Sequence, residues 1–189
     1  SQSKLGVIPK EAGEKITSAA STDLINWDIL KQRTSIVGYP ILPLVEQLSL
    51  SVEDGYGQYC HWGATTQDIM DTADVLQIRK GLNLLSKDLD SIANALSKIV
   101  KDHINTPMAG RTHLQHALPV TFGYKAATWL SSIDRHIKRL EEIKSRIFNV
   151  SFFGAAGTLA SLGEVDGLNT QANLAKELNL NVPDVSWHS

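Results

Sequence analysis

The stretch VLQIRKGLNLLSKDLDSIANALSKIV at 75–100 decides the fold, because its apolar residues return in alternating steps of three and four. The residues of this stripe are Val75, Ile78, Leu82, Leu85, Leu89, Ile92, Leu96 and Ile99. Three more apolar residues widen the stripe beyond a two-stranded seam: Leu76, Ala93 and Val100. The pattern therefore predicts a long helix in the interior of a helical bundle rather than a simple coiled coil.

Polar residues are expected at both ends of this helix. Asp71 or Thr72 would cap its start, and Asp102 with Pro107 beyond would close it, giving about 30 residues and about 45 Å. A second helical run follows Pro119, with Leu130, Ile133, Ile137, Leu140 and Ile147 on one face. The two helices should pack antiparallel through the connection at 105–119.

Shorter helices are expected on either side of the long ones. The sequence predicts helices over 10–20, from a cap at Ser21 to Asp23 through about Thr34, over 41–53, and over 166–180. In the last of these, Leu168, Leu174 and Leu178 should face inward. Nothing alternates with period two, so no sheet is expected.

The expected fold is therefore all-α, with a small N-terminal helical domain at 1–70 followed by an incomplete long-helix bundle at 71–189. The wide apolar faces of the long helices lack enough partners within the chain, which favours missing sequence as well as burial against other subunits.

Composition narrows the partners. The 189 residues are 42% hydrophobic and 20% charged, with a net charge of −2 and no block of like charges, so neither nucleic acid nor a membrane is expected as a partner. No apolar run has the length of a membrane span, and the start lacks the apolar core of a signal peptide. Cys60 is the single cysteine, which suits a reducing cytoplasm. We expect a cytoplasmic protein that acts on something small.

The segment AGRTHLQHALPVTFG at 109–123 concentrates polar groups beside the helices. Arg111 supplies a planar cation that suits a carboxylate, and Thr112 and Gln115 can hydrogen-bond to the same group. His113 and His116 can exchange protons near neutral pH. Alternatively, these residues cap helix ends and bridge a loop. A metal site is not expected, because two histidines at this spacing lack an acidic partner.

A second polar segment, HWGATTQDIMDT at 61–72, stands where the long helix begins. Gly63 allows close backbone approach, and Thr65, Thr66 and Gln67 offer hydrogen-bond donors, so the segment is a candidate anion cradle. An ordinary N-terminal capping sequence is the alternative.

Together these two segments resemble two of the three motif regions of the fumarase/aspartase superfamily. With FGAAGTLASLG and PDVSWHS, they most resemble bacterial 3-carboxy-cis,cis-muconate cycloisomerases and adenylosuccinate lyase-like proteins. The resemblance implies a homotetramer with a pooled helical core and no cofactor. It also implies addition or elimination next to a carboxylate, with a small polycarboxylate as substrate. His113 matches the general acid, and Thr112 and the pair Thr65–Thr66 match contacts to the substrate carboxylate.

The resemblance also shows what these residues lack. The general base of the superfamily is a Ser on a Gly-rich loop in the third motif region, and no such region is present. We therefore interpret the chain as the N-terminal part of a longer protein and expect it to be catalytically silent alone.

Three functions stay open on the sequence. Cycloisomerases typically have Trp where this chain has His113, which favours an adenylosuccinate lyase-like C–N lyase, whereas RTSIVGYPILPLV at 33–45 is of the cycloisomerase type. A non-catalytic helical assembly on the same scaffold is the third possibility. The proton donor is His113 by motif position, with His116 as the second choice.

Overall fold

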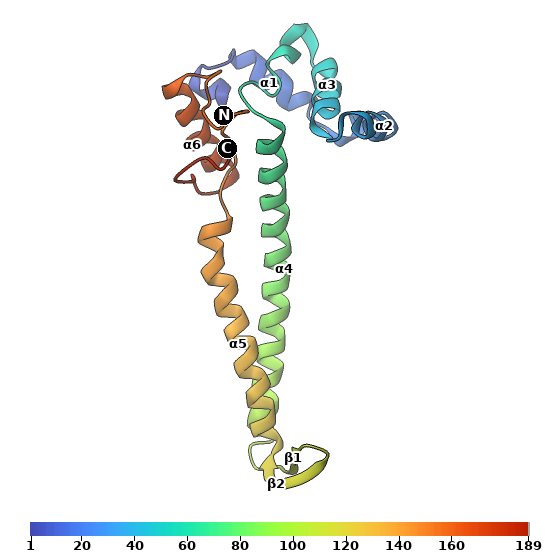
Figure 1. Cartoon of the computed structure of the whole chain (residues 1–189), viewed down its shortest axis with the longest axis vertical. Coiled ribbons are helices and arrows are strands. Elements are labelled where there is room, and N and C mark those ends of the chain that lie inside the picture. Colours follow the sequence, from blue (N-terminus) through green and yellow to red (C-terminus); the bar gives the residue numbers. More distant parts are fainter. Residues whose placement is uncertain (189) are drawn as a thin grey trace. The chain divides into compact units, whose positions relative to one another are not determined.

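A computed structural model describes residues 1–188 and shows a mainly helical chain (Figure 1). The α-helices are α1 (Lys10–Ala19), α2 (Trp27–Val37), α3 (Ile41–Ser51), α4 (Thr66–Asp102), α5 (Phe122–Ile147) and α6 (Glu164–Leu178). Short 3-10 helices are η1 (Gln2–Leu5), η2 (Thr22–Leu24) and η3 (Glu53–Tyr59), and two strands are β1 (Pro107–Thr112) and β2 (Gln115–Thr121). The expectation of a mainly helical fold with long helices is confirmed. None of the helices in the described residues has the length and apolarity to span a membrane.

The chain divides into two compact units. The first contains residues 1–76 together with the described residues from 148 onward, and the second contains residues 77–147. Helix α4 begins in the first unit and ends in the second. The domains expected from the sequence, 1–70 and 71–189, are each one continuous segment, and this division stays a prediction.

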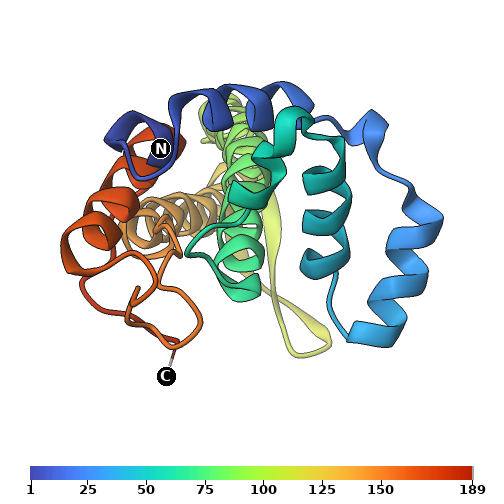
Figure 2. The same cartoon turned by 90° about the horizontal axis from the view of Figure 1, so that it is seen from above.

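The first unit contains the short N-terminal helices. Helices α2 and α3 lie side by side after the turn at Gly38, which adopts a φ of 93° (Figure 2). The predicted cap of α2 was wrong: Ser21 accepts a hydrogen bond from the Asp23 amide and caps η2, whereas Asn26 Oδ1 accepts from the Ile29 amide at 3.0 Å and caps α2. Asn and Ser are both good caps, so local propensity alone does not choose between them.

The start of α4 was also predicted too late. The helix begins at Thr66 rather than after Asp71 or Thr72, and it has 37 residues. Asp68 stands in its first turn and accepts the Thr65 amide at 2.9 Å, which is the backward bond of a capping box. The apolar stripe begins later because the first turns bury polar side chains, Asp68 and Thr72.

Strands β1 and β2 form an antiparallel hairpin, so the expectation of no sheet was wrong. Their two-residue connection is His113–Leu114, and Leu114 has a φ of 58°. Residues 111–119 are all exposed in this chain. A hairpin with both faces exposed needs no alternation of apolar and polar residues, and this removes the pattern by which strands are recognised.

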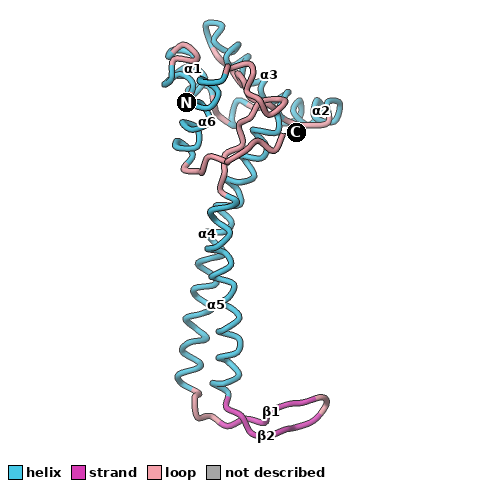
Figure 3. The backbone as a smooth tube through the Cα atoms, turned by 60° about the vertical axis from the view of Figure 1, so that its left-hand side comes forward, coloured by secondary structure: helices cyan, strands magenta, loops and turns pink. Residues whose placement is uncertain are grey.

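In the second unit, α4 and α5 run side by side in opposite directions, as predicted (Figures 1 and 3). The end of α4 and the start of α5 meet at the base of the hairpin. There the amide of Gly123 donates to the carbonyl of His103, and the amide of Phe122 donates to the carbonyl of Thr106, both at 2.9 Å. A Cβ atom on Gly123 would lie 2.8 Å from the carbonyl oxygen of His103 and from Cα of Ile104. The backbones approach so closely here that only glycine fits.

The core of the first unit is built on the segment 150–154, which is buried throughout. Phe152 packs with Leu159 and Leu162, and Leu174 of α6 packs against this cluster. Of the three leucines predicted to face inward on α6, Leu168 was wrong, since it is 59% exposed. The buried face of α6 instead contains Gly167, Thr170, Gln171 and Ala175. Small and polar residues occupy this face, so a search for large apolar residues misplaces it by one position.

We predict that Gly123→Ala lowers the free energy of unfolding by about 1–3 kcal/mol, because the added methyl group overpacks the contact with residues 103–104. Gly81→Ala is the matched control in the same unit, since a Cβ at Gly81 meets nothing within 4 Å. This control should gain about 0.5–1 kcal/mol through the lower entropy cost of alanine in a helix. Urea denaturation followed by circular dichroism measures both, and equal effects of the two substitutions would refute the close approach.

Candidate active site

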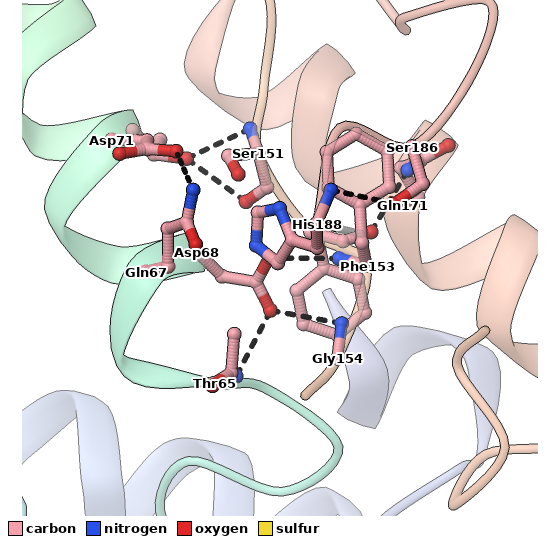
Figure 4. A network of polar contacts seen from close by, with 12 residues as sticks. Thr65, Gln67, Asp68, Asp71, Ser151, Phe153, Gly154, Gln171, Ser186 and His188 are labelled. Atoms are coloured by element: carbon pink, nitrogen blue, oxygen red, sulfur yellow. Dashed lines mark hydrogen bonds and ion pairs between the residues drawn. The ribbon is translucent and has the colours of Figure 1, made fainter. Parts of the chain in front are cut away.

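A buried carboxylate, Asp68, lies at the start of α4, within the polar segment 61–72 (Figure 4). Asp68 is 1% exposed and accepts three backbone hydrogen bonds. Its Oδ1 accepts from the amide of Phe153 at 2.8 Å, and its Oδ2 accepts from the amides of Gly154 at 3.1 Å and Thr65 at 2.9 Å. Three hydrogen bonds to one carboxylate join the loop before α4 to the segment 150–154.

One turn further along α4, Thr72 makes a second connection to the same segment. Its hydroxyl accepts from the amide of Ser151 and donates to the carbonyl of Ser151, both at 3.0 Å. From the other side, Nε2 of Gln171 in α6 donates to the carbonyl of Phe152 at 2.8 Å. Polar side chains of two helices thus satisfy the backbone of a buried segment that belongs to neither helix nor sheet.

His188 completes this region. Its side chain is 2% exposed, and Nε2 lies 2.9 Å from Oδ1 of Asp68 without the alignment of a hydrogen bond. The imidazole packs edge-on against Phe153, and so does Trp187, both with ring centroids 4.9 Å apart. The imidazole of His188 therefore packs in the core around Asp68, whereas Trp187 touches Phe153 and stays 45% exposed.

His61 is a half-buried histidine of the same unit. Its Nε2 is buried and has no hydrogen-bond partner, and its backbone adopts a positive φ of 62°. Burial lowers the pKa of His61 below its ordinary value of 6.5, and a backbone hydrogen bond with Thr65 and the nearby charge of Asp68 oppose that change. The neutral imidazole is thus the form that the fold favours.

The candidate anion cradle lies in the first unit. Thr65, Thr66 and Gln67 line a pocket of about 380 Å³ together with Tyr39, Met70 and Asp71. The amide group of Gln67 donates to Asp71 at 3.3 Å. The structure therefore places the three predicted residues around one cavity, and their binding of a substrate anion stays a prediction.

The other predicted residues lie together on the hairpin of the second unit. The register places Arg111 directly opposite His116, and Thr112 directly opposite Gln115, while His113 is in the turn. Opposite residues share a face and successive residues alternate, so one face presents Arg111 with His116 and the other presents Thr112 with Gln115. The hairpin brings five of the eight predicted residues together, and the three cradle residues belong to the other unit.

The sequence interpretation missed the buried polar residues, above all Asp68 and Thr72. Both are in the quoted segment HWGATTQDIMDT, and their spacing of four residues on a helix was the available signal. Among residues 1–188, no group of three or more His, Cys, Asp and Glu side chains is arranged to hold a metal ion.

The sequence pattern of the lyase family matches residues 2–187. This chain belongs to the lyase family, within the fumarase/aspartase superfamily. The resemblance inferred from the two polar segments is confirmed.

Three similar proteins match this chain over its whole length. A fumarate lyase from Mesorhizobium sp. BNC1 has a crystal structure that is 61% identical, with a TM-score of 0.94, and the match covers 100% of this chain and 44% of that one. Trans-aconitate decarboxylase 1 of Mycosarcoma maydis is 46% identical, with 100% of this chain and 38% of that protein covered. The 3-carboxy-cis,cis-muconate cycloisomerase of Pseudomonas aeruginosa is 41% identical, with 100% and 41% covered. The chain thus spans about two fifths of the length of the curated relatives that it matches.

We predict that Asp68→Asn lowers the free energy of unfolding by about 3 kcal/mol or more, because hydrogen bonds to a charged group contribute about 1.5–3 kcal/mol each. An amide would also turn its NH₂ group toward at least one of the three backbone donors. Asp74→Asn, at an exposed position of the same helix, is the control and should stay within about 0.5 kcal/mol of wild type. Urea denaturation compares the two variants, and a wild-type midpoint for Asp68→Asn would contradict the anchoring role.

A pH dependence follows from His61. Because its pKa is lower in the folded than in the unfolded chain, the unfolded chain binds more protons as the pH falls through 6.5 and below, and stability is lost there. His61→Asn removes this titration and suits the positive φ. Between pH 7.5 and pH 5.5, the wild-type protein should therefore lose more unfolding free energy than His61→Asn does. A difference independent of pH would contradict the burial of a neutral imidazole.

Proposed function

We propose that this chain forms part of an enzyme that adds or eliminates a group next to a carboxylate on a small polycarboxylate, in the manner of 3-carboxymuconate cycloisomerase. The observation that carries the proposal is the hairpin. Five of the six residues from Arg111 to His116 bear a cation, an imidazole, a hydroxyl or an amide, and all are exposed around one turn. No acidic residue is present in either strand or in the turn.

Each of these groups has a role in the proposed reaction. Arg111 binds one substrate carboxylate with its guanidinium fork, and Thr112 and Gln115, on the other face of the hairpin, donate hydrogen bonds to a second carboxylate. These donors stabilise the negative charge that develops when a proton leaves the carbon next to the carboxylate. Thr65, Thr66 and Gln67 are proposed to bind a further anionic group of the substrate.

His113 is the proposed general acid. In an elimination, a base takes the proton from the carbon next to the carboxylate, the electron pair forms a double bond, and the acid gives a proton to the leaving group. In the reverse direction the same histidine takes that proton back. His116, on the face shared with Arg111, is the second candidate for the proton donor. The general base is assigned to no residue of this chain.

Two of the relatives support a polycarboxylate. Trans-aconitate and 3-carboxy-cis,cis-muconate, the compounds named for them, are both unsaturated acids with three carboxylate groups. One relative is named as a decarboxylase and the other as a cycloisomerase, so similarity supports the class of substrate more strongly than the reaction. A lyase that releases fumarate from adenylosuccinate is the second candidate, favoured by the histidine at position 113. The homotetramer belongs to the proposal as well.

The test is an assay of the full-length protein with 3-carboxymuconate, trans-aconitate and adenylosuccinate. We predict that His113→Ala lowers kcat by about 100-fold to 10,000-fold, the usual contribution of a general acid, and that His116→Ala lowers it less. His136→Ala, at an exposed position of α5 outside the hairpin, is the control. A wild-type rate for His113→Ala would remove it from the mechanism.

The same assay separates an enzyme from a helical assembly without activity. Turnover of none of the three substrates by the full-length protein would favour the assembly. The 189-residue chain alone should show no turnover, because it supplies the proposed acid and the anion cradle without a base. Turnover by that chain alone would refute this division of roles.

A further inference from the structure

A cavity beside the hairpin contains a second cation that the proposed mechanism does not use. The cavity has a volume of about 270 Å³ and lies between strand β1 and the first turns of α5, wholly within the unit 77–147. Arg111 lines it from the strand, and Lys125 lines it from the helix. Tyr124 and Thr128 add two hydroxyl groups to the wall, and none of the lining residues is acidic.

Neither cation is neutralised within the described residues. No carboxylate forms an ion pair with Arg111 or Lys125 in this part of the chain. The ammonium group of Lys125 lies 5.6 Å from the centre of the Trp129 ring, a contact that orients the side chain while leaving its charge in place. Two unpaired cations around one small cavity create a positive field that favours an anion.

The backbone of the hairpin changes register beside this cavity. Ala109 pairs with Pro119, but Arg111 pairs with His116, so β2 carries one extra residue between these pairs. Without that residue Arg111 would stand opposite Ala117. Gly110 occupies the irregular position, where a Cβ atom would lie 2.4 Å from the carbonyl oxygen of Leu118. The bulge in β2 therefore sets which residue lies opposite Arg111.

The start of α5 contributes a field but not its first amides. The amides of Phe122 and Gly123 donate to the carbonyls of Thr106 and His103, and the amide of Tyr124 donates to the hydroxyl of Thr121 at 3.1 Å. The positive end of the helix dipole still lies at the N-terminus of α5, beside the cavity. An anion in the cavity is therefore held by side chains, and Lys125 supplies the charge opposite Arg111.

We propose that this cavity binds one carboxylate group of the substrate between Arg111 and Lys125, with the hydroxyl group of Tyr124 as a further donor. The hydroxyl of Thr128 donates to the carbonyl of Lys125 at 2.7 Å and only lines the cavity. The identity of the anion as a substrate carboxylate rests on the proposed function, whereas the anion site itself rests on the cavity and its charges. Lys125 then becomes a determinant of affinity for polycarboxylates. A bound carboxylate here would leave the other face of the hairpin, with Thr112 and Gln115, free for a second group.

The experiment uses the full-length protein and propane-1,2,3-tricarboxylate, a saturated acid that binds without reacting. Isothermal titration calorimetry measures its dissociation constant for wild type, Lys125→Gln, Lys125→Arg and the control Lys138→Gln, an exposed lysine of α5 outside the cavity. We expect Lys125→Gln to weaken binding about 10-fold, which corresponds to the loss of one charged contact. Lys125→Arg should restore most of the affinity, and Lys138→Gln should match wild type.

Further measurements separate this proposal from the proposed function. Weaker tricarboxylate binding by Lys125→Gln, in a protein that turns over none of the assayed substrates, would support the site and refute the function. Normal turnover with an unchanged KM and unchanged binding in Lys125→Gln would refute the site alone. Inorganic phosphate provides the remaining comparison: if it binds as tightly as the tricarboxylate and depends equally on Lys125, the assignment to a carboxylate is overturned.

Discussion

The carboxylate of Asp68 is the contact on which the first unit depends. It accepts amides from Thr65, Phe153 and Gly154, and so joins segments that are 85 residues apart along the chain. A buried charge is costly unless such donors surround it, and here three backbone groups that would otherwise lack partners supply them. Thr72 repeats the arrangement one turn later with the backbone amide and carbonyl of Ser151. The start of α4, which includes two of the three cradle residues, is fixed by these bonds rather than by apolar packing alone.

Within the polar segment 61–72, some residues stabilise the fold and others are candidates for binding a substrate. Asp68 and Thr72 face inward and hold the fold, while Thr65, Thr66 and Gln67 line a cavity just before and within the first turn. A rigid helix start is a good base for groups that must meet a substrate, because side chains on regular elements are held more exactly than those on loops. In the second unit a short hairpin does the same for Arg111 and the two histidines, with the close approach at Gly123 fixing where α5 begins.

Much of the fold could be predicted because helical periodicity is a local property. The stripe from Val75 to Ile99 predicted α4, and the apolar run after Pro119 predicted α5. Apart from the cap of α2, the errors share one physical cause, which is that polar or exposed residues took positions where apolar ones were expected. The early start of α4 buries Asp68 and Thr72, the inward face of α6 presents Thr170 and Gln171 in place of Leu168, and the hairpin exposes both of its faces. In each case partners distant in sequence decide which residues are buried.

The sequence by itself determined the family, the long helices and the residues that carry the candidate chemistry, because motifs and periodicity are properties of neighbouring positions. Only the tertiary structure decided how those residues are grouped. Strand register places Arg111 opposite His116 and Thr112 opposite Gln115, a shift of one residue would exchange those faces, and no local pattern records the shift. The cavity that joins Arg111 to Lys125 has the same origin, since a helix and a strand must fold together before two cations 14 positions apart can share one ligand.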